Sequence, residues 1–273
     1  MTHVDRFAED YLSGLHLYGN DFSLEEIRKW YEDEQEGYAN LGNKDKLAYN
    51  YQYSEMDKLF GYRYIDKSIK FSNVLGLGSA YGHEFLPIIN QIENLTIVEP
   101  SEKLRSDKLC DLVPTYVKPE LNGKLNFKDN TFDLIVSFSV LHHIPNVSFV
   151  MEELYRVLKP NGIILIREPI VTMGDWRKPR KGLTKNERGI PKSFFEIFIQ
   201  YHSLEIISKK YCDSAFMYKI LGKLFGIKHN SKFYQTLDSY ISFIFSWNYI
   251  YHRTKLFHKI APASIFLVLQ KNQ

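Results

Sequence analysis

The stretch 73–82 constrains the fold of this 273-residue chain more than any other, and it reads N-V-L-G-L-G-S-A-Y-G. Its first half predicts a short buried strand, and residues 82–92 predict a helix. The glycines Gly76, Gly78 and Gly82 crowd the turn that joins them. A strand that passes through a glycine-rich turn into a helix lets a ligand approach the backbone where a side chain would block it.

Strand and helix patterns alternate along the chain around this turn. Apolar runs at residues 95–98, 134–139 and 162–166 predict further strands, and residues 147–158 predict a helix with one apolar face. Such alternation is typical of a parallel sheet with helices on both faces, which binds ligands at the carboxyl ends of its strands. We therefore expect a doubly wound, Rossmann-like α/β fold with a ligand at the glycine turn.

Three kinds of cofactor site use a glycine turn of this type. The sequence does not match the dinucleotide fingerprint G-x-G-x-x-G, because Tyr81 stands at the position of the third glycine. Only Gly76, Gly78 and Glu99 therefore support an assignment as a nicotinamide oxidoreductase. The phosphate loop fails because the chain contains no Gly-Lys-Ser or Gly-Lys-Thr. Read from Gly78, the turn is G-S-A-Y-G, which is close to the G-x-G-x-G turn of class I S-adenosylmethionine-dependent methyltransferases.

Four stretches of the chain carry a wider resemblance. They read V-L-G-L-G, I-V-E-P-S, F-K-D-N-T-F-D and L-K-P-N-G, and they begin at residues 74, 97, 127 and 158. In this order they resemble the small-molecule methyltransferases called type 11, over residues 70–170. The resemblance implies S-adenosylmethionine as the cofactor. It also implies a mostly parallel sheet with an antiparallel edge strand, for which residues 263–269 are the candidate.

The cofactor contacts follow from the turn and the resemblance. Glu99 lies about twenty residues beyond the turn, where an acid at a strand end can accept hydrogen bonds from both ribose hydroxyls. The resemblance places the amino-acid end of the cofactor beside Gly76, Gly78, Ser79, Ala80, Gly82 and Ser137. It places the nucleoside end beside Pro100, Ser101, Glu120, Asn126 and Phe127.

The chain departs from the family pattern at two positions. Gly76 stands where the family usually has an acid, and Ala80 replaces the middle glycine of the turn. The missing carboxylate weakens the hold on the cofactor's ammonium group, unless a backbone carbonyl or a residue of a lid replaces it. These departures are the support for an alternative from another class, a non-catalytic methyltransferase-like binding scaffold.

Methyl transfer from a sulfonium requires in-line positioning and exclusion of water, and an oxygen or nitrogen acceptor also requires a base. His142 and His143 follow the central strand, and we weigh a base against two structural histidines, with His143 the favoured base. Glu168 is a second candidate, and its neighbour Arg167 either neutralises it or binds substrate. We expect methyl transfer to a small-molecule or glycan-type acceptor, more at oxygen than at carbon.

Three regions are expected. Residues 1–66 form a helical N-terminal cap or lid with a capping box at Ser23 and Glu26, and residues 67–172 form the methyltransferase core. Residues 173–273 hold a substrate loop, a helical insertion and the final strands of the sheet. In the loop, Trp176 and Arg177 suit an anionic or sugar-bearing substrate.

The aromatic-rich segment 214–258 has no apolar run that reaches the roughly twenty residues of a membrane span. Its default interpretation is a helical cap over the pocket or a contact with another subunit, and shallow docking on a membrane surface is the lesser alternative. The net charge of +3 gives no reason to expect nucleic acid. Cys110 and Cys212 form neither a disulfide framework nor a metal pattern, and no signal peptide is evident, so we expect a cytoplasmic protein without a metal.

Overall fold

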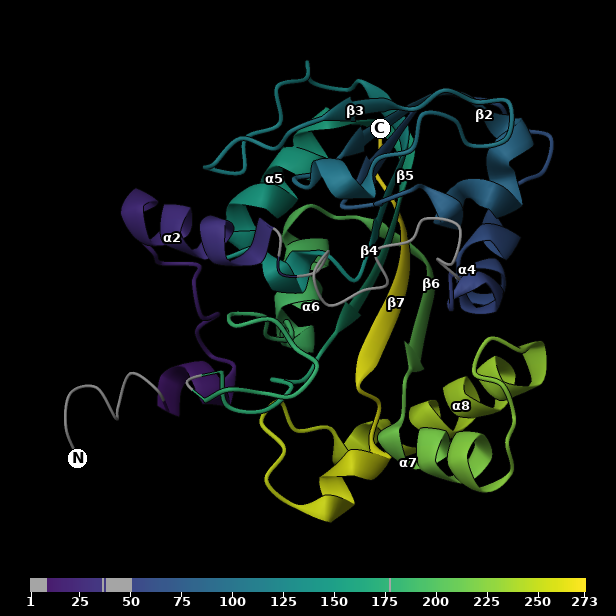
Figure 1. Ribbon diagram of the computed structural model, residues 1–273. Helices are drawn as coiled ribbons and strands as arrows, with labels where there is room; N and C mark the ends of the chain where they lie inside the picture. Colours follow the sequence, from purple (N-terminus) through teal and green to yellow (C-terminus); the bar gives the residue numbers. More distant parts are fainter. Residues whose placement is uncertain (1–8, 36, 38–50, 177) are drawn as a thin grey trace.

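One sheet of seven strands forms the centre of the protein (Figure 1). The computed structural model describes residues 9–35, 37, 51–176 and 178–273. The strands are β1 (Phe71–Leu77), β2 (Ile92–Val98), β3 (Thr115–Val117), β4 (Phe132–Phe138), β5 (Leu158–Pro169), β6 (Glu205–Cys212) and β7 (Ser264–Gln270). Their order is β3-β2-β1-β4-β5-β7-β6. Strands β1 to β5 are parallel, whereas β7 runs antiparallel between β5 and β6. The expected doubly wound, mostly parallel sheet is confirmed.

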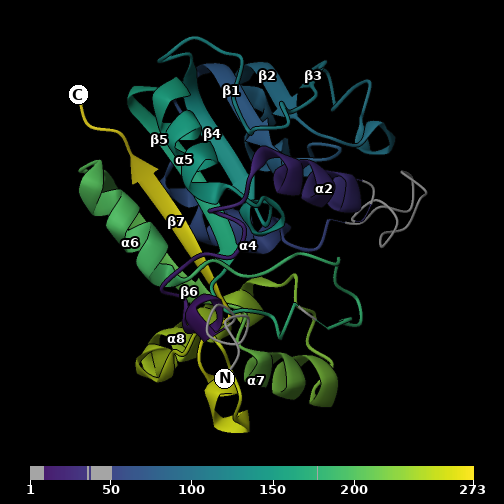
Figure 2. The same ribbon diagram turned by 90° about the vertical axis from the view of Figure 1, so that its left-hand side faces the viewer.

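Helices cover both faces of the sheet (Figure 2). On one face lie α5 (Val147–Val157) and α6 (Lys192–Tyr201), and on the other lie α4 (Ser54–Phe60) and the 3₁₀ helix η3 (His83–Gln91). Successive side chains of a strand point to opposite faces, so β4 needs apolar residues at almost every position. Its Ile135 packs with α5, whereas Val136 packs toward η3.

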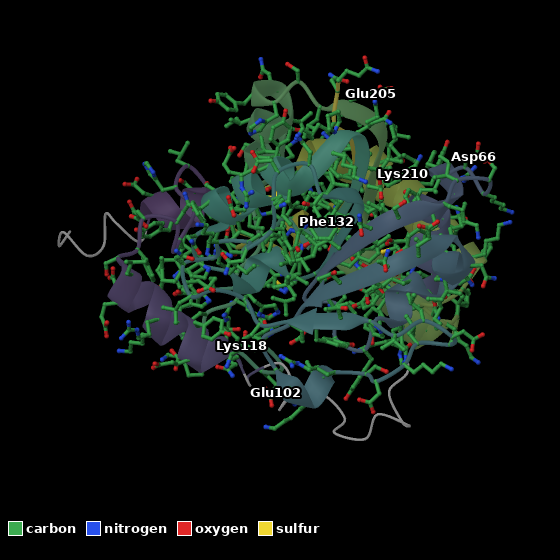
Figure 3. The ribbon with its side chains drawn as sticks, turned by 90° about the horizontal axis from the view of Figure 1, so that it is seen from above. Asp66, Glu102, Lys118, Phe132, Glu205 and Lys210 are labelled. Atoms are coloured by element: carbon green, nitrogen blue, oxygen red, sulfur yellow. The ribbon has the colours of Figure 1, made fainter. Side chains whose placement is uncertain are left out.

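The remaining helical segments lie mostly around the sheet's edges. They are α2 (Leu24–Gln35), η2 (Tyr62–Tyr64), η4 (Glu102–Leu104), η5 (Leu141–His143), α7 (Ala215–Met217), the π-helix η6 (Tyr218–Leu224), α8 (Lys232–Ile244), η7 (Phe245–Asn248) and η8 (Leu256–Ile260). Figure 3, seen from above, places Phe132 in the middle of the molecule. The charged residues labelled there lie around the outside, namely Asp66, Glu102, Lys118, Glu205 and Lys210.

Local sequence signals explain where the helices begin and how they wind. The capping box of α2 is present, because the Ser23 amide donates to the Glu26 carboxylate at 2.8 Å and the Glu26 amide donates to the Ser23 hydroxyl at 3.4 Å. The helix expected after the glycine turn forms as the 3₁₀ helix η3, which contains Pro87. Proline lacks the amide that an α-helix would use, so a tighter winding is favoured there.

The segment after β6 is helical, as expected, and lies beyond the end of the sheet at the bottom of Figure 1. Among the described residues no helix is both long and apolar enough to cross a membrane. Cys110 and Cys212 are both free thiols.

The chain between β5 and α6 has no helix or strand in its described part, and it is held by close backbone contact. The Ile190 amide donates to the Pro169 carbonyl at 2.8 Å, which brings the end of this loop back to the end of β5. Gly189 lies so close to the loop's start that an added Cβ would be 1.9 Å from the Val171 carbonyl oxygen. A side chain at position 189 therefore requires the backbone to move.

We predict that Gly189→Ala lowers the free energy of unfolding by about 3 kcal/mol, because backbone atoms cannot yield as a flexible side chain can. The measurement is urea denaturation followed by circular dichroism. Gly222→Ala is the matched control, since its Cβ would make an ordinary 3.6 Å contact with the Tyr218 ring. Its unfolding free energy should stay within about 1 kcal/mol of the unsubstituted protein. Equal stability of the two variants would contradict the close packing.

Candidate functional site

A cavity of about 680 Å³ lies at the carboxyl ends of β1, β2 and β4. The glycine turn, the end of β2, the turn after β4, helix α2 and residues 51–53 all contribute to its wall. Met173, Gly182 and Glu187 of the loop after β5 also line it, so this loop reaches the cavity as the sequence analysis expected. Parallel sheets of this kind place their ligands at the same edge.

The structure brings half of the sequence-predicted site residues to this cavity. Those that line it are Gly78, Ser79, Ala80, Glu99, Pro100, Glu120, His142, His143 and Arg167. Those that lie outside its lining are Gly76, Gly82, Ser101, Asn126, Phe127, Ser137, Glu168 and Trp176. Arg177 falls outside the described residues. Several of the second group support the first, as Asn126 does by donating to the Glu120 carboxylate at 2.7 Å.

Backbone hydrogen bonds fix the conformation of the glycine turn. The Gly78 amide donates to the Val98 carbonyl at 2.8 Å, and the Gly82 amide donates to the Ser79 carbonyl at 2.7 Å. Gly78 has φ +60°, and a Cβ there would lie 2.5 Å from Val140, so only glycine fits. The buried Ser79 hydroxyl lines the cavity, and it meets no strictly aligned hydrogen-bond partner among the described residues although Glu84 lies within its influence. An unsatisfied buried hydroxyl at a cavity wall is suited to a polar ligand.

Glu99 joins this turn to the end of β2. Its carboxylate accepts hydrogen bonds from the amides of Ala80, at 3.2 Å, and Ser101, at 3.0 Å. The Tyr116 hydroxyl donates to the Ala80 carbonyl at 2.8 Å and so fixes the turn from a third strand. Glu99 is buried yet lines the cavity, which places an oriented carboxylate beside the glycine turn.

The absence of an acid at Gly76 has a steric cause. A Cβ at Gly76 would lie 2.4 Å from the Ser79 hydroxyl oxygen, so an acidic side chain does not fit at the end of β1. A carboxyl group reaches the cavity from η3 instead, through Glu84. Burial raises the pKa of Glu84 to about 8, against the pull of the Ser79 hydroxyl. The sequence analysis missed Glu84, whose signal is a lone acid among the apolar residues of this short helix.

Glu168 organises the turn after β4. Its fully buried carboxylate accepts hydrogen bonds from the amides of Val140 and Leu141, both at 2.8 Å. It also lies 2.7 Å from Nδ1 of His142. Burial lowers the pKa of His142 and His143 adds to the shift, although Glu168 opposes it. His142 is therefore a neutral, oriented imidazole at the cavity wall.

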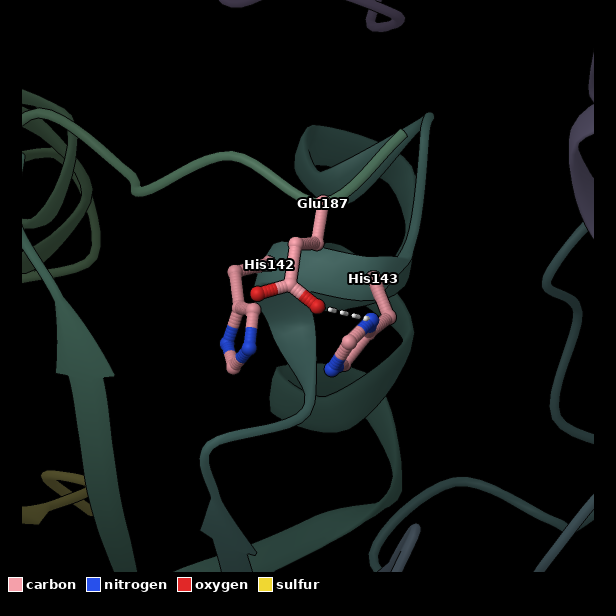
Figure 4. A group of neighbouring side chains, drawn as sticks. All are labelled: His142, His143 and Glu187. Atoms are coloured by element: carbon pink, nitrogen blue, oxygen red, sulfur yellow. Dashed lines mark ion pairs between the residues drawn. The ribbon is translucent and has the colours of Figure 1, made fainter. Parts of the chain in front are cut away.

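His143 is flanked by two acids from distant parts of the chain. Its Nδ1 lies 2.9 Å from Glu34 of α2 and 3.7 Å from Glu187 of the loop after β5 (Figure 4). Burial alone would raise the pKa of Glu34. Hydrogen bonds with His143 and Thr184 outweigh this effect and hold the pKa below its usual value. Sequence reasoning missed both acids, because no local pattern connects α2 or the loop to the turn after β4.

His142, His143 and Glu187 offer ligand atoms that all lie within 4.8 Å of one another. Two imidazoles and a carboxylate are a ligand set that divalent transition metals accept. The sequence analysis expected no metal because Cys110 and Cys212 form no metal-ligand pattern, and it did not consider Glu187.

Arg188 donates hydrogen bonds to the backbone of residues 141–145, which we call the histidine turn. The sequence analysis also missed this residue. Its buried guanidinium donates to the carbonyls of Tyr18 at 2.9 Å, His142 at 3.0 Å and Ile144 at 2.9 Å. Burial lowers its pKa to about 10, so it stays charged at neutral pH. The N-terminal segment, the histidine turn and the loop are thereby locked together.

Two predicted substrate residues have partners of their own. Arg167 lines the cavity, but it forms a buried ion pair with Asp57 at 2.8 Å and lies 4.0 Å from the Tyr53 ring centroid. Trp176 is stacked on Tyr18 at 4.9 Å, away from the cavity lining. Arg167 is therefore the one of the two that borders the cavity, and the Asp57 carboxylate balances its charge there.

Comparison with known proteins shows which family the part of the chain around this cavity resembles. Residues 75–166 match the family model Methyltransf_11, a methyltransferase domain. The uncharacterized methyltransferase YbaJ of Bacillus subtilis is 32% identical over 130 residues, covering 45% of this chain and 51% of YbaJ. The probable polyketide synthase 41 of Dictyostelium discoideum is 26% identical over 171 residues, covering 51% of this chain and 7% of that protein. The matches thus span about half or less of these curated relatives.

The fold is also that of solved methyltransferases. The N-methyltransferase NodS of Bradyrhizobium japonicum, solved with S-adenosylhomocysteine, superposes with a TM-score of 0.54 at 13% identity. The match covers 88% of this chain and 99% of NodS.

Proposed function

We propose that this chain, whose residues 75–166 match a methyltransferase-domain model, is a class I methyltransferase that transfers a methyl group from S-adenosylmethionine to a small-molecule or glycan-type acceptor, at oxygen. One observation carries the proposal: a single cavity is lined both by the glycine turn with Glu99 and by the histidine pair. A donor site and a candidate base therefore share one enclosure, which methyl transfer requires.

The residues at the donor side fit this cofactor. Glu99 accepts hydrogen bonds from the ribose hydroxyls, and Glu120 serves the nucleoside end with support from Asn126. Ser79 and Glu84 face the amino-acid end, where Glu84 supplies the carboxylate that Gly76 lacks. When bound, the cofactor supplies an electrophilic sulfonium methyl group, so the protein contributes positioning and exclusion of water rather than covalent chemistry.

On the acceptor side His143 removes the proton from the attacking hydroxyl. The Glu34 carboxylate beside its Nδ1 orients the ring and stabilises the imidazolium that forms when the ring takes that proton. His142 stands beside it, with ring centroids 4.2 Å apart, and Glu168 positions it. Arg167, whose charge Asp57 balances, borders the acceptor side of the cavity as a hydrogen-bond donor.

Cofactor binding tests the proposal directly. We predict that isothermal titration calorimetry detects binding of S-adenosylhomocysteine, and that Glu84→Gln weakens it by about tenfold, because a charged hydrogen bond to the ammonium is lost. Glu196→Gln, a change of the same kind on the exposed end of a surface ion pair with Lys209, should bind normally. A protein that is folded but binds neither S-adenosylhomocysteine nor S-adenosylmethionine would support the non-catalytic scaffold instead.

The same titrations have a pH signature. The raised pKa of Glu84, about 8 in the free protein, means that the carboxyl must release a proton to pair with the ammonium at neutral pH. Affinity should therefore rise as the pH increases from about 6 to about 8, and Glu84→Gln should remove most of this rise. An unchanged pH dependence in the variant would exclude Glu84 from this role.

His143→Ala should lower turnover by about a hundredfold while leaving affinity for S-adenosylhomocysteine near normal, because only proton removal is lost. The measurement is release of S-adenosylhomocysteine with whichever phenolic or sugar hydroxyl compound is the best acceptor in a panel. His202→Ala is the control, because His202 pairs with Glu152 away from the cavity lining. If a chelator abolishes turnover and a divalent cation restores it, His143 acts as a metal ligand and not as the base.

A further inference from the structure

Helix α8 turns an unusually polar face toward the protein. This face carries Gln235, Asp238 and Ser242, all fully buried, beside the buried Tyr234, which packs with Met217 and Leu221. Its outer stripe is apolar and continues into η7 and η8, and we call the exposed side chains Phe233, Tyr240, Phe243, Ile244, Trp247 and Phe257 the apolar patch. Phe243 and Trp247 are 67% and 71% exposed. Surface helices of water-facing proteins show the opposite pattern.

Hydrogen bonds of two of the buried polar side chains, Asp238 and Gln235, hold α8 in this orientation. The Asp238 carboxylate accepts hydrogen bonds from the amides of Asp213 at 2.7 Å and Ser214 at 3.0 Å. The Gln235 side chain donates to the His229 carbonyl at 2.9 Å. Rotating α8 to hide its apolar stripe would break these bonds and bury unsatisfied groups. The apolar patch is therefore a property of the folded state.

The surroundings of the apolar patch are strongly basic. Asp238 is the only acid between residues 215 and 260, and it is buried. The exposed lysines of the same segment are Lys219, Lys223, Lys228, Lys232, Lys255 and Lys259. Exposed aromatic rings flanked by lysines with no exposed acid are the composition of a surface that lies on anionic lipid.

We propose that the apolar patch docks on the surface of an anionic phospholipid bilayer. The aromatic rings enter the boundary between headgroups and acyl chains, and the surrounding lysines contact the lipid phosphates. Self-association through the apolar patch is less favoured by charge, because it would bring two sets of lysines together. This inference concerns a second surface and does not depend on the proposed methyl transfer.

The helical segment that carries the apolar patch also borders the cavity. Asp213, the residue after β6, lines the cavity and lies 3.4 Å from His229 of this segment. The His229 ring in turn contacts the ring of Tyr53, another residue of the cavity wall. The segment that carries the apolar patch is therefore connected to the cavity wall through His229.

Vesicle flotation of the full chain tests the proposal. The probes are vesicles of phosphatidylcholine alone and of phosphatidylcholine with phosphatidylglycerol. The chain should float with the anionic vesicles, at least about tenfold more than with the neutral ones at low salt, and less as salt increases. The double variant Phe243→Ser with Trp247→Ser should lose this binding. The control is Ile197→Ser with Tyr201→Ser, two exposed apolar positions on α6 outside the apolar patch.

A second variant separates charge from burial of the rings. Lys228→Glu with Lys232→Glu should reduce binding to anionic vesicles while leaving the apolar patch intact. Analytical ultracentrifugation without lipid completes the test. Absence of vesicle binding would overturn the proposal, as would equal binding by the two double serine variants. Self-association of the unsubstituted chain that only the patch variant abolishes would assign this surface to a second copy and overturn it as well.

Discussion

The hydrogen bond between the Ala80 amide and the Glu99 carboxylate connects the glycine turn after β1 to the end of β2. It works together with the bond from the Gly78 amide to Val98, so the turn is bound to its neighbour strand at two points. Because the turn cannot move, the wall of the cavity has one shape, and the carboxylate beside it has one orientation. A preformed site of this kind costs little ordering when a ligand binds.

The parts of the fold that could be predicted from sequence are those with local signals. The glycine turn, the alternation of strands and helices and the capping box at Ser23 each lie within a few residues, and each forms as expected. The acids around His143 could not be predicted, because Glu34 lies 109 residues away and meets the histidine only after α2 packs against the core. Long-range contacts of buried polar groups leave no periodic pattern in the chain.

The helical insertion after β6 shows a different limit of prediction from sequence. Its aromatic content and its helices follow from the sequence, but the direction in which α8 faces does not. A helix with apolar residues on one side and Gln235, Asp238 and Ser242 on the other would ordinarily be placed with the apolar side inward. The open amides at the end of β6 reverse this choice, since Asp238 satisfies two of them. Hydrogen bonds to the backbone therefore contribute to the orientation together with the packing of Tyr234 against Met217 and Leu221.

Gly76 departs from the family pattern, and in the sequence analysis this departure supported a scaffold without catalysis. The Ser79 hydroxyl occupies the space that an acidic side chain would need, and Glu84 delivers a carboxyl group to the same cavity from η3. Burial disfavours the charged form of this carboxyl group and raises its pKa to about 8. An incoming ammonium group removes that penalty. The departure at Gly76 therefore fits a relocated contact better than a lost one.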